Sequence, residues 1–147
     1  MIPTLPLRTR NRLAELIVAA LGDVDARREL AALATAPPAE WTAECDAHRA
    51  PLIAKRARAA TDALEGQPIL SPATSLADAL RAAALLFDAG LGFETHEVLE
   101  SHWSRAEGAA RESLQGLIQV AVGYQHLSST DRAALTPPRF PRAARAA

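Results

Sequence analysis

The chain has 147 residues, of which 49% are hydrophobic and 22% are charged, a balance typical of a globular protein rather than a disordered one. This length accommodates one ordinary domain, or a compact domain with an extension. The formal net charge of −1 gives no general attraction to nucleic acid or to an anionic membrane surface. The single cysteine excludes an internal disulfide and a metal cage built from thiolates alone.

No segment of the sequence predicts export or membrane insertion. The N-terminal residues lack the apolar core of a signal peptide, and the longest apolar stretch, near 13–21, is far shorter than the roughly 20 residues that span a bilayer. We therefore expect a cytosolic protein without a membrane partner, and nucleic acid is not an expected partner either. A small molecule, another protein and a second copy of the chain remain as candidate partners.

The first half of the chain shows the helical spacing of apolar residues. Residues 8–21 predict an amphipathic helix, and an aspartate after Gly22 is placed to cap a second helix that runs to about Thr35. Residues 39–64 predict two helices or one kinked helix, because Pro51 stands in the middle of this segment. No segment shows a convincing strand pattern.

The second half is predicted to hold three helices after a linker. The best linker candidate is 66–72, which is rich in glycine and proline. Ser75 is placed to cap the next helix, and Gly90 stands where a left-handed residue ends it. A short connection around Gly108 joins the last two helices. The predicted helices are 76–89, 92–106 and 109–127.

We therefore predict an all-α protein, an up-and-down helical bundle with an N-terminal helical extension. The sequence divides into an extension over 1–66, a linker over 67–74, the bundle over 75–130 and a tail over 131–147. The tail combines proline with arginine and has no apolar period, so we expect it to be disordered.

The penultimate predicted helix places polar side chains inside an apolar stripe. At 100° per residue, His96, Glu100 and Trp103 share one face with Phe93, and Glu97 stands at the edge of that face. A buried polar group without a partner costs roughly 1–3 kcal/mol. We therefore expect these groups to pair with one another or with something bound.

The last predicted helix adds candidates from the facing side of a hairpin. The short connection makes the two helices antiparallel. This places Gln115 level with Glu100 and Gln119 level with His96. His126 is expected to lie at one end of the patch that these residues form. The predicted ligand-binding patch or polar network consists of Phe93, His96, Glu97, Glu100, Trp103, Gln115, Gln119 and His126.

Two linked motifs in this region match a known family. The segment FDAGLGFETHEVLESHW begins at Phe87, and LQGLIQVAVGYQH follows from Leu114. Over about 76–127, the chain resembles the uncharacterised bacterial and archaeal family catalogued as domain of unknown function 309. The resemblance implies a small up-and-down helical bundle with no established activity. After His126 the sequence departs from the family pattern, because SSTDR and a proline-rich tail replace a Gly-Asn turn and a basic amphipathic helix.

Three interpretations of the predicted patch stay open. The first is a buried hydrogen-bond network that fixes helix register. The second is a binding site for a small ligand or peptide, with Phe93 and Trp103 as walls. The third is a metal or acid-base centre, because His96 and Glu100 at i and i+4 suit two ligands to one ion, although HExxE lacks the second histidine of HExxH. The sequence favours a binding module, with a metal-dependent hydrolase-like enzyme using His96 and Glu100 as the alternative, and it identifies no cofactor.

Overall fold

The computed structural model of the chain describes residues 5–42, 49–71 and 75–129, and within the last range the side chains up to residue 124. These residues form seven helices and no strand, which confirms the all-α prediction. The helices are α1 (Leu7–Ala19), α2 (Val24–Thr35), α3 (Ala39–Thr42), α4 (Ala50–Leu64), α5 (Leu76–Asp88), α6 (Gly92–Trp103) and α7 (Gly108–Ser129).

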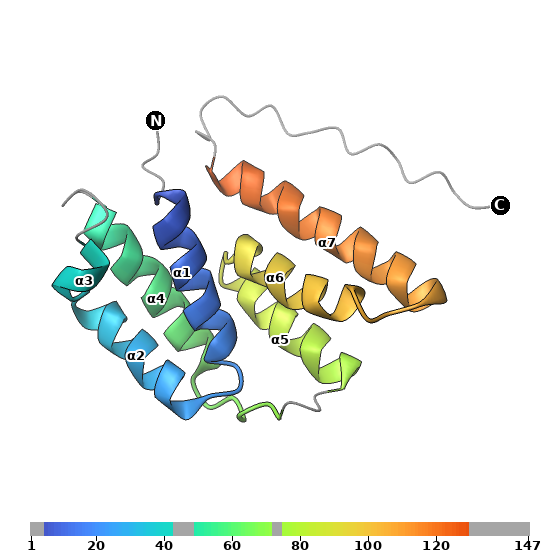
Figure 1. The fold of residues 1–147 in the computed structure, drawn as a ribbon, viewed down its shortest axis with the longest axis horizontal. Coiled ribbons are helices and arrows are strands. Elements are labelled where there is room, and N and C mark those ends of the chain that lie inside the picture. The colour runs from blue at the N-terminus through green and yellow to red at the C-terminus, as the bar shows by residue number, and fades with distance from the viewer. Residues whose placement is uncertain (1–4, 43–48, 72–74, 130–147) are drawn as a thin grey trace.

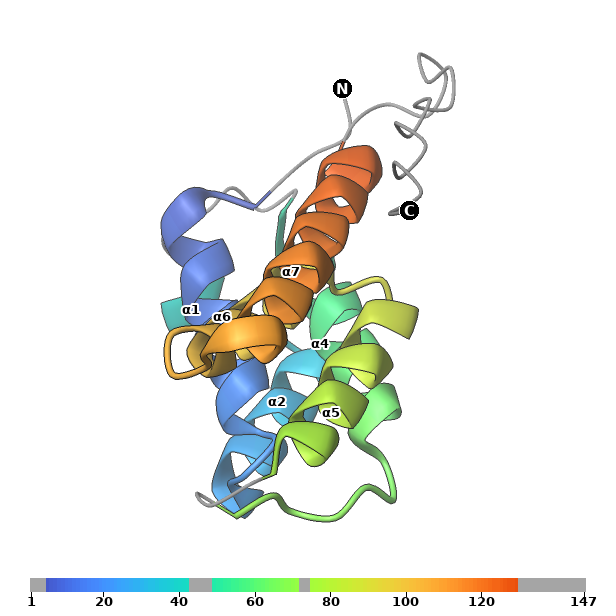
Figure 2. The same ribbon diagram turned by 90° about the vertical axis from the view of Figure 1, so that its right-hand side faces the viewer.

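The helices pack as two groups around one core (Figures 1 and 2). α2 packs along α4, α6 packs against α5, and α7 runs back along α6. α1 contacts α6 and α4 contacts α5, so the N-terminal helices cover the α5–α6 hairpin. One continuous apolar cluster includes Leu13 of α1, Ile53 of α4, Leu86 of α5 and Leu99 of α6. The bundle with a packed N-terminal helical extension is thereby confirmed.

Local sequence signals explain the predicted helix ends. The Asp23 side chain accepts a hydrogen bond from the backbone N–H of Asp25 at the start of α2, and Ser75 accepts one from Asp78 at the start of α5. Gly90 has a φ of +79°, the left-handed conformation that glycine adopts after a helix without steric cost.

Two helix boundaries refine the prediction from the sequence. The described residues between 39 and 64 include two helices, α3 and α4, and Pro51 lies in the first turn of α4, where its missing N–H would have no partner within the helix. α6 ends at Trp103 rather than at residue 106. The backbone N–H groups of Arg105 and Ala106 bond to carbonyls three residues back, which tightens the chain as it turns towards α7.

Arg27 ties the segment between α4 and α5 to the N-terminal helices. Its guanidinium donates hydrogen bonds of 2.6–3.4 Å to four backbone carbonyls, those of Ala20, Leu64, Gln67 and Pro68. The N–H of Leu70 also donates to the Leu21 carbonyl at 2.9 Å. The glycine- and proline-rich segment is therefore held against the end of α1 and the start of α2.

Within the described ranges, no helix is long and apolar enough to cross a membrane. The cytosolic location and the division of the chain at 67–74 stay predictions. The tail over 131–147, expected to be disordered, lies outside the described residues.

Candidate functional site

The buried side of α6 fixes the orientation of this helix. Val98 and Leu99 belong to the apolar core, and Thr95, which is 3% exposed, donates its hydroxyl proton to the Leu91 carbonyl at 2.9 Å. α6 also packs against α1, α5 and α7. These contacts fix the rotation of α6 about its own axis. This rotation determines which polar side chains of α6 lie close to one another.

His96 lies between two carboxylates of its own helix. Glu100 Oε2 lies 3.3 Å from His96 Nε2, and Glu97 Oε1 lies 3.4 Å from His96 Nδ1. The His96 side chain is 22% exposed, against 42% for Glu97 and 52% for Glu100. The imidazole is therefore more buried than the two carboxylates, which are both accessible to solvent. His96 Nδ1 is buried and has no hydrogen bond, because its contact with Glu97 lacks hydrogen-bond geometry. We name these three residues the His-Glu-Glu cluster.

Two aromatic residues stand before and after the His-Glu-Glu cluster along α6, and each contacts an arginine of another helix. The rings of Phe93 and His96 are stacked, with centroids 6.2 Å apart and planes at 27°. The Arg10 guanidinium of α1 lies 4.2 Å from the centre of the Phe93 ring, and Arg111 of α7 lies 3.9 Å from the Trp103 ring. The two arginines were not predicted, because a cation above a ring on another helix leaves no spacing signal in the sequence.

The predicted site residues of α7 lie apart from these contacts. Gln115 and Gln119 are exposed, and among the described residues they take part in no hydrogen bond. They lie about one and two helical turns after Arg111, on the same face of α7. The side chain of His126 lies outside the described residues. The structure thus brings His96, Glu97 and Glu100 together and leaves the glutamines at the surface.

Glu94 is the residue of the motif whose role the sequence did not reveal. Its side chain is fully buried, and Arg56 Nη2 of α4 donates to both of its carboxylate oxygens, at 2.9 and 3.1 Å. The helical wheel places Glu94 away from the stripe of His96 and Glu100. In the sequence, a charged residue on an otherwise apolar face indicates that a partner of opposite charge is needed. The Arg56–Glu94 pair joins the motif to the N-terminal helices.

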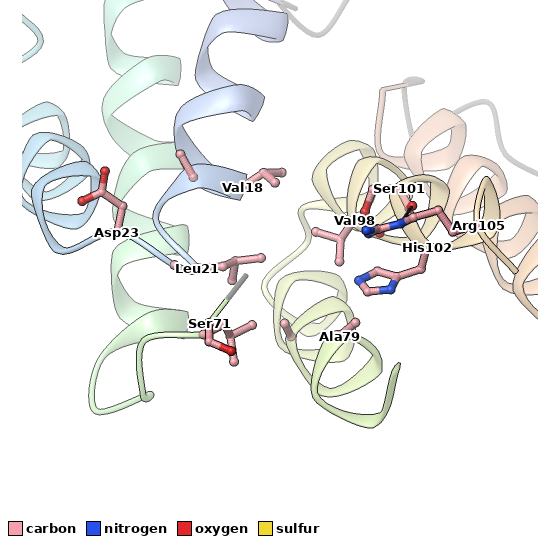
Figure 3. Close-up of a pocket in the computed structure, with 13 residues that line it drawn as sticks. Val18, Leu21, Asp23, Ser71, Ala79, Val98, Ser101, His102 and Arg105 are labelled. Carbon is pink, nitrogen blue, oxygen red and sulfur yellow. Dashed lines mark hydrogen bonds between the residues drawn. The ribbon is translucent and has the colours of Figure 1, made fainter. Parts of the chain in front are cut away.

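A cleft of about 650 Å³ lies on another side of α6. One wall is the last part of α6 together with Arg105, and the facing wall consists of the end of α1, residues 21–23 and residues 70–71 (Figure 3). Burial lowers the pKa of His102 on the first wall, and the nearby charge of Arg105 lowers this pKa further. The cleft contains none of the residues of the His-Glu-Glu cluster.

Comparison with known proteins confirms the resemblance seen in the sequence. Residues 80–135 match the family described as Domain of unknown function (DUF309). The match starts within α5 and contains all of α6 and α7, so it includes the His-Glu-Glu cluster and Glu94, but not α1 to α4. No curated protein and no solved structure matches the chain. The chain is therefore a helical protein that resembles, over residues 80–135, a family of unknown function.

Proposed function

We propose that this protein is a binding module for a divalent metal ion, which is held by His96 and Glu100 and oriented through Glu97. One observation carries this proposal: an imidazole nitrogen and two carboxylate oxygens lie within 4.8 Å of one another on the outer side of α6. An imidazole nitrogen and a carboxylate oxygen suit zinc, iron or manganese, and the second carboxylate is left to orient the imidazole. The charges also suit a dication, because the two carboxylates together carry the opposite charge.

The spacing within the His-Glu-Glu cluster supports this assignment. His96 Nε2 and Glu100 Oε2 are 3.3 Å apart. Two ligands about 2.0–2.1 Å from one tetrahedral ion lie about 3.3 Å apart, so an ion fits between them with little side-chain movement. Glu97 is then placed to accept the proton of His96 Nδ1–H, as carboxylates often do for histidines that bind metals. A small rotation of Glu97 would satisfy the buried nitrogen that otherwise lacks a partner.

The number of protein ligands favours reversible binding. Structural zinc sites have four protein ligands, whereas here water must complete the coordination. A hydrolase would also use an ion with open positions, but it needs a concave site for its substrate beside the ion. The 650 Å³ cleft and a smaller cavity beside Arg27 contain no residue of the cluster. We therefore propose ion binding rather than hydrolysis.

Calorimetric titration of the full chain, stripped of metal with a chelator, tests this function. Zinc is expected to bind at one site with micromolar affinity, and manganese more weakly, as the general order of divalent-ion affinities predicts. His96→Asn and Glu100→Gln should each weaken zinc binding at least tenfold, since each removes a ligand. Glu97→Gln should weaken it less, because Glu97 orients the imidazole.

Glu112→Gln is the matched control, since Glu112 is an exposed glutamate of α7 with no ion pair to a described residue. It should leave zinc binding unchanged. Zinc binding that His96→Asn does not weaken, or the absence of any binding heat in the stripped protein, would overturn the proposal.

A further inference from the structure

The cleft beside the end of α6 has the dimensions of a small-molecule site and lies apart from the His-Glu-Glu cluster (Figure 3). Its volume of about 650 Å³ lies within the range of 300–1,000 Å³ typical of ligand pockets. Apolar side chains from several elements line it, namely Val18, Leu21, Leu70, Ala79, Ala82 and Val98. Covering this surface with the apolar part of a ligand would be favourable.

The basic groups of the cleft lie on one wall. His102 and Arg105 are one turn apart, and Figure 3 shows their side chains next to each other on the α6 wall. Arg105 Nε donates to the Ser101 carbonyl at 3.3 Å. The two terminal nitrogens of this guanidinium form no hydrogen bond or ion pair within the described part of the chain. A planar guanidinium with two unused nitrogens is suited to a carboxylate or a phosphate.

The carboxylate of the cleft lining is turned away from this basic wall. Asp23 Oδ1 accepts the backbone N–H of Asp25 at 2.8 Å, as the cap of α2. Figure 3 shows the Asp23 carboxylate pointing away from His102 and Arg105. Within the described lining, no carboxylate therefore neutralises the Arg105 guanidinium.

We propose that this cleft binds a small organic anion. Arg105 pairs with the carboxylate or phosphate group of the ligand, His102 contacts the same group, and the apolar body of the ligand covers the floor between α1 and α5. The site is independent of the proposed metal site, because it uses a different side of α6.

The test is an NMR titration of the full chain with hexanoate, hexyl phosphate and hexanol. The two anions are expected to shift the amide signals of Leu70, Ala82 and His102, and at least one anion should bind ten times more tightly than hexanol. The difference between the two anions identifies the preferred head group. Arg105→Gln should weaken anion binding at least tenfold, whereas Arg105→Lys should keep part of it because the charge remains.

Arg28→Gln is the control, since Arg28 is an exposed arginine of α2 that pairs with Asp25. It should leave anion binding unchanged, and an unaltered amide spectrum in the absence of ligand shows that each variant is folded. Three results would overturn the proposal: hexanol binding as tight as that of both anions, anion binding unaffected by Arg105→Gln, or no shift of these signals with either anion. None of these results bears on zinc binding at His96.

Discussion

Replacing Arg56 with methionine is expected to lower the free energy of unfolding by about 2–4 kcal/mol. The fully buried carboxylate of Glu94 would lose the guanidinium that donates to both of its oxygens. Breaking a buried ion pair by removing one partner costs roughly 3–5 kcal/mol. The Arg56 side chain is 30% exposed, so water can replace part of the lost contact, and the expected loss therefore extends somewhat below that range.

Urea unfolding at neutral pH measures this change. Lys55→Met is the matched control, because Lys55 is an exposed residue of the same helix, and its replacement should change stability by less than about 0.5 kcal/mol. The double variant Arg56→Met, Glu94→Met should recover much of the loss, since no buried charge remains unpaired. Equal effects of Arg56→Met and Lys55→Met would show that Glu94 does not depend on Arg56.

Replacing Arg27 with alanine is expected to cost about 2–4 kcal/mol. The guanidinium joins the end of α1, the end of α4 and the following segment through four backbone carbonyls. A hydrogen bond to a charged group contributes roughly 1.5–3 kcal/mol, but bonds that share one side chain do not add fully. Arg27→Lys should lose most of the same stability, because an ammonium group cannot reproduce the planar fork of donors.

Arg28→Ala, next to Arg27 on α2, is the control for the unfolding measurement. Its ion pair with Asp25 is highly exposed, and such pairs contribute little. Hydrogen exchange adds a local readout, since Arg27→Ala should speed exchange of the Leu70 amide, which bonds to the Leu21 carbonyl. If this amide exchanges at the same rate in both variants, Arg27 does not hold the segment in place.

The sequence predicted those features that depend on neighbouring residues. The spacing of apolar side chains located the helices, and Ser75 and Gly90 marked the limits of α5. The contact of His96 with Glu100 could be predicted for the same reason, since residues at i and i+4 of one helix are neighbours whatever surrounds them.

The positions of Gln115 and Gln119 could not be predicted in this way. A helical wheel shows which residues share a face, but not which face turns towards the next helix. In α7 the buried residues include Leu114 and Ala121, about 100–160° around the helix from the two glutamines, which are therefore exposed.

Partners that are distant along the chain escaped prediction as well. Arg56 and Glu94 are 38 residues apart, and Arg27 reaches the Pro68 carbonyl across 41 residues. Only the packing of α4 against α5 and α2, and of α1 against α6, brings such groups together. The charge of Glu94 among apolar positions indicates that it needs a partner, but composition and spacing do not identify one so far along the chain, and the structure assigns it to Arg56.

The most direct test of metal binding is the position of a zinc ion in crystals of the full chain grown with zinc, located from anomalous scattering on both sides of the zinc absorption edge. An ion held as proposed gives an anomalous peak about 2.0–2.1 Å from His96 Nε2 and a similar distance from a Glu100 oxygen. A Glu97 oxygen should then lie within hydrogen-bond distance of His96 Nδ1. A peak at another position only, or no peak although zinc is present in solution, would contradict metal binding by the His-Glu-Glu cluster.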